Sequence, residues 1–140
     1  MLRFIRPRVP METILLVDDN PLRASLRQSM LEGGASRPVR AVVRASDASE
    51  ALCLVESPEF AQGLALVITG HMMSGISGPE FVAELRSRMP HVPVLVLSPA
   101  AGARREYEEI EGVFNSGTSS PDELRMLVGQ LVSLGQRQTA

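Results

Sequence analysis

The sequence predicts an α/β protein in which helices cover both faces of a doubly wound parallel sheet. Short apolar segments without polar alternation are typical of strands buried on both faces, and here they recur between segments with helical periodicity. Strand and helix patterns alternate five times, which favours right-handed crossovers and a parallel sheet. With 140 residues, 44% of them hydrophobic, the chain is long enough to form one domain with its own core.

Five segments have the pattern of strands. The first, third and fourth are aliphatic runs, as buried central strands require, whereas the second mixes valine with arginine in the manner of an edge strand. The fifth is brief. The predicted strands span residues 13–17, 39–44, 64–69, 92–97 and 112–114.

The predicted helices begin at capping residues or at proline. Pro21 opens the first helix, Asp47 and Glu50 form a capping pair for the second, and a Ser-Gly-Pro segment starts the third. The predicted helices span residues 21–33, 48–56, 77–89, 103–110 and from 121 onward. Between these elements an expanded loop is expected around residues 32–38 or 57–63.

Composition suggests a cytoplasmic protein without a membrane or nucleic-acid partner. No apolar run approaches the roughly 18 residues that a membrane span requires, and a net charge of −2 gives no reason to expect nucleic-acid binding. Cys53 is the single cysteine, which fits a reducing compartment. The basic first ten residues suggest a division into an extension (1–10), a domain (11–135) and a tail (136–140).

From Met11 onward the chain resembles the receiver domains of bacterial response regulators. The resemblance rests on four segments in this order and spacing: ILLVDDNP, LALVITGHMMSGISGPEF, VPVLVLSP and SSPDEL. It implies a flavodoxin-like (βα)5 fold with strand order 2-1-3-4-5 and a role in two-component signal transduction. In such sheets the functional residues lie beyond the carboxyl ends of the strands.

Asp18 and Asp19 match the acidic pair with which these receivers bind Mg²⁺. Two adjacent carboxylates with no nearby base repel one another and favour a hard cation or a raised pKa. The alternative is a solvated strand end, with Asp19 or Asn20 capping the next helix. The resemblance adds the backbone carbonyl of Met72 as a ligand, so we expect at most a weak Mg²⁺ site at Asp18, Asp19 and Met72.

The chain departs from the family at two positions of the phosphorylation site. Gly70 stands where the family has the aspartate that accepts the phosphoryl group, and Gly117 where it has a lysine. All 14 basic residues are arginine, so no lysine exists elsewhere to take this role. Ser98 keeps the hydroxyl position, and Phe114 occupies the place of the switch aromatic, with plain core packing as its alternative. The resemblance therefore predicts a degenerate pocket of Asp18, Asp19, Gly70, Ser98 and Gly117.

These departures favour a pseudo-receiver, a signalling module that is not an enzyme and requires no cofactor. Its expected partner is a histidine kinase or another signalling protein, docking on the first helix and residues 115–120, with a homodimer left open. One alternative is a conventional receiver that is phosphorylated on a displaced acceptor, Asp18 or Asp19. The other is a flavodoxin-like cofactor-binding protein or enzyme, which the acidic loop after the first strand disfavours because it repels phosphate.

Overall fold

The sheet is parallel, five-stranded and ordered β2-β1-β3-β4-β5. The structure is a computed structural model that describes residues 13–32, 41–70, 75–97, 113–116 and 120–139. The strands are β1 (Thr13–Val17), β2 (Ala41–Ala45), β3 (Leu64–Gly70), β4 (Val94–Leu97) and β5 (Val113–Ser116). The predicted fold class and strand order are confirmed.

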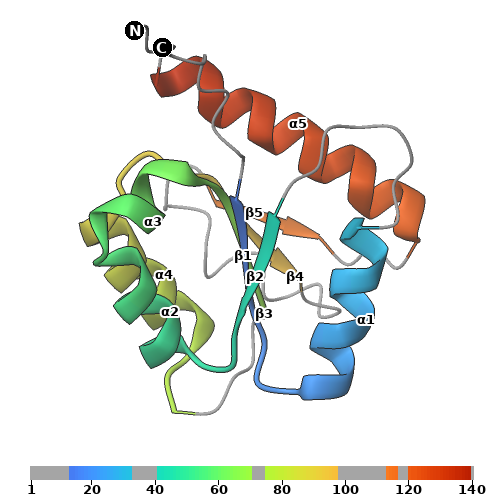
Figure 1. The fold of residues 1–140 in the computed structure, drawn as a ribbon, viewed down its shortest axis with the longest axis horizontal. Helices are drawn as coiled ribbons and strands as arrows, with labels where there is room; N and C mark the ends of the chain where they lie inside the picture. The colour runs from blue at the N-terminus through green and yellow to red at the C-terminus, as the bar shows by residue number, and fades with distance from the viewer. Residues whose placement is uncertain (1–12, 33–40, 71–74, 98–112, 117–119, 140) are drawn as a thin grey trace, which may run out of the picture.

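Helices cover both faces of this sheet, as Figure 1 shows. One face is covered by α1 and α5, and the other by α2, α3 and α4. The helices are α1 (Pro21–Glu32), α2 (Ala48–Val55), α3 (Pro58–Gly63), α4 (Gly78–Arg88) and α5 (Pro121–Thr139). The connections from β1 to α1 and from β2 to α2 leave the sheet at its carboxyl edge.

Alternate residues of the central strands feed two separate cores. In β1, Ile14 and Leu16 pack into the cluster beneath α1 and α5, while Leu15 and Val17 pack into the cluster beneath α2 and α4. All four are at most 1% exposed, so β1 is buried on both faces as its unbroken apolar run predicts. Because alternate side chains of β1 point to opposite faces, these four apolar residues contact both helical layers.

Two of the predicted caps are present in the structure. The Asp47 carboxylate accepts a hydrogen bond of 2.8 Å from the backbone N–H of Glu50 at the start of α2. Ser77 and Glu80 form a reciprocal capping box at the start of α4. These local bonds satisfy backbone donors that the first turn of a helix leaves free.

The short helix α3 differs from the sequence prediction, which gives residues 57–63 as one of two possible places for an expanded loop. Ser57 and Pro58 do supply a typical helix start, although the Ser57 side chain makes no capping bond.

The strand β4 begins at Val94 rather than at residue 92, since Pro93 has no N–H to donate to a ladder. The predicted helix at 103–110 lies outside the described residues. The helix α5 continues to Thr139, and the division at residues 10 and 135 stays a prediction.

The first turns of α1 present large apolar side chains to solvent. Leu22 is 84% and Leu26 62% exposed, whereas the small Ala24 between them is 2% exposed. The beginning of α1 therefore approaches the sheet through an alanine and leaves an aliphatic pair outside. Neither leucine contributes to the core.

We expect Phe81→Ala to lower the free energy of unfolding by about 3–5 kcal/mol, because the truncation leaves a cavity in a closed core. Phe81 is 0% exposed and belongs to the cluster beneath α2 and α4. Urea unfolding followed by circular dichroism measures the change. Met126→Ala is the matched control, since Met126 is 63% exposed and should change stability by less than about 0.5 kcal/mol. Equal effects of the two substitutions would contradict the assignment of Phe81 to the core.

Candidate functional site

The candidate site lies where β1 and β3 end, at the carboxyl edge of the sheet. The strand register pairs Val17 with Thr69, so the residues that follow them, Asp18 and Gly70, are neighbours in this register. Both are buried, and Gly70 also pairs with Leu97 of β4. The structure thus brings Asp18 and Gly70 together at the carboxyl edge of the sheet.

The carboxylate of Asp18 is enclosed by N–H donors. Its Oδ1 accepts from the backbone N–H of Asn20 at 3.0 Å and from Nε and Nη2 of Arg23 at 3.1 and 2.7 Å. Its Oδ2 accepts from Nε of Arg23 at 2.9 Å and from Nη1 of Arg27 at 2.9 Å. The Asp18 side chain is 0% exposed, so these bonds replace the water that a carboxylate would otherwise hold.

The two arginines lie four residues apart and therefore on one face of α1. The Arg23 side chain is 42% exposed and that of Arg27 19%. Hydrogen bonding to Asp18 raises the pKa of Arg23, whereas burial lowers the pKa of Arg27, and repulsion from Arg23 adds to that lowering. Both guanidinium groups stay charged at physiological pH because arginine does not lose its proton in proteins. The expectation of an acidic pair without a nearby base is therefore wrong.

Asn20 fixes the start of α1 and with it the position of Arg23. Its Oδ1 accepts a hydrogen bond of 3.0 Å from the backbone N–H of Arg23, and its carbonyl accepts one of 2.9 Å from Ala24. Of the two residues predicted to cap this helix, Asn20 is thus the one that does. Pro21 follows at the first helical position, where a missing N–H costs nothing.

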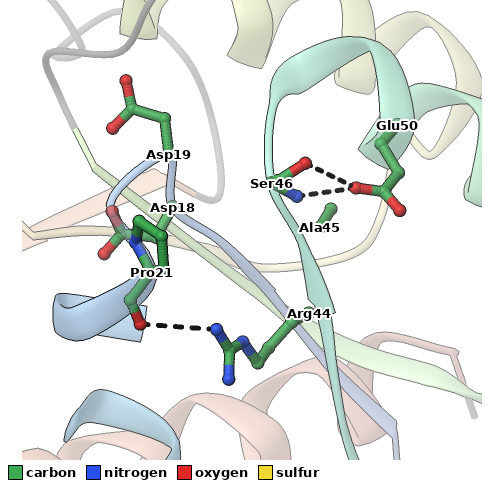
Figure 2. Close-up of a pocket in the computed structure, with 7 residues that line it drawn as sticks. All are labelled: Asp18, Asp19, Pro21, Arg44, Ala45, Ser46 and Glu50. Atoms are coloured by element: carbon green, nitrogen blue, oxygen red, sulfur yellow. Dashed lines mark hydrogen bonds between the residues drawn. The ribbon is translucent and has the colours of Figure 1, made fainter. Parts of the chain in front are cut away.

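Asp19 has a different environment from its neighbour. Its side chain is 25% exposed and lies 3.5 Å from Nη2 of Arg23, which Asp18 already engages at 2.7 Å. Figure 2 shows the Asp19 carboxylate standing apart from that of Asp18. The two adjacent aspartates therefore share the guanidinium group of Arg23, and their carboxylates do not converge on one cation position.

A pocket of about 280 Å³ opens beside these aspartates, between the ends of β1 and β2 (Figure 2). Arg44 on its wall donates to the Ser25 hydroxyl at 3.1 Å and to the Pro21 carbonyl at 3.4 Å. Across the pocket, Oε1 of Glu50 accepts from the backbone N–H and the hydroxyl of Ser46 at 2.7 and 2.9 Å. The lining residues are Asp18, Asp19, Pro21, Arg44, Ala45, Ser46 and Glu50.

The residues at this edge do not fit the divalent cation that the resemblance implies. Mg²⁺ takes oxygen ligands in near-octahedral geometry and needs carboxylate lone pairs that are free to coordinate it. Each oxygen of Asp18 already accepts at least two hydrogen bonds, and Gly70 offers no side chain. Within the described ranges, no group of three or more His, Cys, Asp or Glu residues is placed to hold a metal ion. The predicted ligand Met72 lies outside those ranges.

The remaining predicted site residues divide between the described and undescribed parts of the chain. Ser98 and Gly117 lie outside the described residues, so their place in the pocket stays a prediction. Phe114 lies on β5, is partly buried and packs against the cluster beneath α1 and α5. That contact agrees with the core-packing alternative, and a switch role for Phe114 stays a prediction.

Sequence reasoning missed Arg23 and Arg27, which hold the candidate site together. The pattern that could have found them is their spacing after a helix start at Asn20-Pro21, which places both on one face next to the end of β1. Arg23 also stands in the first turn of a helix that has no acidic residue there. A cation in that turn opposes the helix dipole, so an arginine at this position needs an anionic partner.

The fold and this edge define the class of protein. The model of the response regulator receiver domain matches residues 14–114, which cover most of the sheet and the candidate site. The chain belongs to this family, whose members are signalling modules of two-component signal transduction and interact with histidine kinases or other signalling proteins.

Individual relatives agree with this assignment. The response regulator protein FleR of Pseudomonas aeruginosa is 29% identical over 127 residues, which make up 89% of this chain and 25% of FleR. The chain therefore spans about a quarter of that relative's length. The signal receiver domain of an HD domain-containing protein from Pseudomonas fluorescens Pf-5 superposes with a TM-score of 0.79 at 18% identity, covering 96% of each chain.

A second solved structure is similar at still lower identity. The CheY-like receiver domain protein from Methanospirillum hungatei JF-1 has a TM-score of 0.75 at 14% identity, covering 91% of this chain and 98% of that one. Likenesses at these identities concern the fold alone.

In the part of the chain that the structure describes, no helix is long and apolar enough to cross a membrane.

We expect Asp18→Ala to lower the free energy of unfolding by about 3 kcal/mol, because it leaves the mostly buried cation of Arg27 without its anion. The expected loss of stability lies at the low end of the range for broken buried ion pairs, because the partly exposed Arg23 can turn toward solvent. Urea unfolding at constant ionic strength measures the change.

Asp122→Ala is the matched control for this substitution. Asp122 also pairs with an arginine, Arg125, at 2.6 Å, but its side chain is 90% exposed. Its removal should cost less than about 1 kcal/mol. A rise in stability when Asp18 is removed would contradict this expectation, because it would mean that repulsion of the Asp18 carboxylate outweighs its ion pairs with arginine.

Proposed function

We infer that this chain is a pseudo-receiver, a phosphorylation-independent protein-interaction module of two-component signalling. In this proposal it binds a histidine kinase or another signalling protein in the cytoplasm, and it neither catalyses a reaction nor requires a cofactor. The observation that carries the proposal is Gly70 at the end of β3, next in register to the buried Asp18.

Phosphoryl transfer needs a nucleophilic oxygen in line with the leaving group. At the family's acceptor position Gly70 has no side chain, and the sequence contains no lysine to contact the phosphoryl oxygens. The acceptor aspartate and the lysine, both absent here, are the anion and the cation of the same phosphorylation site in the family. A receiver fold with this pocket keeps its surfaces but has no group to modify at the usual position.

The geometry also argues against Asp18 as a displaced acceptor. Its side chain is 0% exposed, and both of its oxygens accept hydrogen bonds from guanidinium groups. Such bonds draw electron density from a carboxylate and block the approach of a phosphodonor. Asp19, at 25% exposure, is the more accessible of the two, so a direct test on the whole chain is needed.

The exposed aliphatic pair on α1 supports the interaction part of the proposal. Leu22 and Leu26 lie four residues apart on one helix face and are 84% and 62% exposed. Exposed aliphatic residues on a helix that the fold holds rigidly are suitable anchors for a partner helix. This face belongs to the first helix, where the family resemblance places kinase docking.

We expect no phosphorylated species when the full chain is incubated with Mg²⁺ and a small phosphodonor such as acetyl phosphate. Intact-mass spectrometry under neutral, cold conditions checks this, with a conventional receiver treated in parallel as the positive control. A stoichiometric phosphoryl adduct on the chain would overturn the pseudo-receiver assignment. Peptide mapping would then show whether Asp18 or Asp19 carries it.

We expect the double variant Leu22→Ser, Leu26→Ser to reduce partner binding by at least about tenfold, because truncating buried anchors typically costs 1–2 kcal/mol or more at an interface. Quantitative pull-down from cells of the source organism, with the purified chain itself included as a candidate partner, provides the measurement. Met126→Ser is the control, since Met126 is 63% exposed, as much as Leu26, but lies on α5. Undiminished binding by the α1 variant would place the docking surface elsewhere.

A further inference from the structure

The Asp18 carboxylate has no oxygen lone pair left for an added ligand. An ionised carboxylate offers about four acceptor sites, and here five N–H···O contacts between 2.7 and 3.1 Å converge on its two oxygens. Four of the five come from guanidinium groups, which make the stronger, charge-assisted bonds. Any divalent cation at this carboxylate would have to displace Arg23, Arg27 or both.

The arginines are part of the framework of α1 and are not free surface cations. The Asn20 cap and Pro21 set the start of the helix, which places Arg23 at its third residue and Arg27 one turn later on the same face. Nε and Nη2 of Arg23 both reach Asp18, the two-pronged geometry that arginine forms with carboxylates and that lysine cannot form. Arg27 is 19% exposed, so its charge is committed to this site.

At this edge of the sheet, the positive charges of α1 are balanced by carboxylates of the same chain. Arg23 in the first turn opposes the helix dipole, and the two guanidinium groups repel each other. Both penalties are offset by the anions at the end of β1, Asp18 and, at 3.5 Å, Asp19. Two carboxylates thus face two guanidinium groups, which leaves little net negative charge to attract a metal ion.

We propose that Arg23 and Arg27 are resident cations of this receiver, taking the place of the divalent metal at Asp18 and fastening α1 to the carboxyl end of β1. The domain accordingly keeps α1, with its exposed leucines, in position without Mg²⁺. This role is independent of whether any other residue of the chain is phosphorylated.

Metal binding by the unmodified full chain is the first test. Mn²⁺ serves as the probe because the electron paramagnetic resonance of the free ion reports how much is bound. We expect the wild type to bind no more Mn²⁺ than Asp18→Asn does, at low-millimolar metal and constant ionic strength. One Mn²⁺ bound per wild-type chain and lost in Asp18→Asn would overturn the proposal. This comparison reads binding directly and does not depend on phosphorylation.

A double-mutant cycle is the second test, because it isolates the coupling between the carboxylate and the arginines. We expect Asp18→Asn to lower the urea midpoint when it is made in the wild type. When it is made in the double variant Arg23→Gln, Arg27→Gln, we expect the midpoint to stay unchanged or to rise. Arg88→Gln is the matched background, since Arg88 pairs with Glu84 and Glu56 elsewhere on the surface.

Two results of the cycle would contradict the proposal. One is an equal loss of midpoint from Asp18→Asn in all three backgrounds, which would mean that Asp18 contributes without the arginines. The other is a higher midpoint for Asp18→Asn in the wild type, the behaviour of an uncompensated acidic site. If the double arginine variant does not fold, the single variant Arg23→Gln replaces it, because the Arg23 side chain is 42% exposed in the wild type. In that background Asp18→Asn should lower the midpoint less than in the wild type, since Arg27 is the one guanidinium group still paired with Asp18. An equal loss in the two backgrounds would contradict the proposal.

Discussion

The buried carboxylate of Asp18 is the constraint on which this end of the molecule depends. Among the described residues it is the one charged side chain that is buried, and Thr69 is the one other buried polar residue. A lone carboxylate at 0% exposure would be strongly destabilising. Its position at the end of β1 therefore dictates that α1 bring cations to it, and the Asn20 cap and the spacing of Arg23 and Arg27 meet that demand.

The rest of the fold provides a rigid base for this charge cluster. β1 lies between β2 and β3 at the centre of two aliphatic cores, so the backbone that carries Asp18 is held by ladders on both sides. In contrast, the start of α1 buries little apolar surface, with Ala24 as its buried residue. Ion pairing at Asp18 thus supplies at this helix start part of the anchoring that apolar burial supplies in α2, α4 and α5.

Much of the fold could be predicted from the sequence because its determinants are local. The unbroken apolar run of β1, the capping pair at Asp47 and the Ser77 capping box each act within a few residues. The boundaries that differed, such as the start of β4, depend on which backbone N–H groups the neighbouring strand engages. Arg23 and Arg27 escaped prediction because an arginine's partner is set by where its helix lies on the sheet, which is a tertiary property. The resemblance points to Gly70 and Gly117 as departures from the phosphorylation site, whereas Arg23 and Arg27 lie outside the four segments on which it rests.

The two-pronged contact of Arg23 with Asp18 has a consequence for how such a domain can carry information. A counter-ion supplied by the same chain is present at a fixed effective concentration, whatever the ionic content or energy state of the cell. For the proposed pseudo-receiver, binding to a partner then follows the concentrations of the domain and of that partner by mass action. Under that proposal, regulation acts through synthesis, turnover and competition for shared partners.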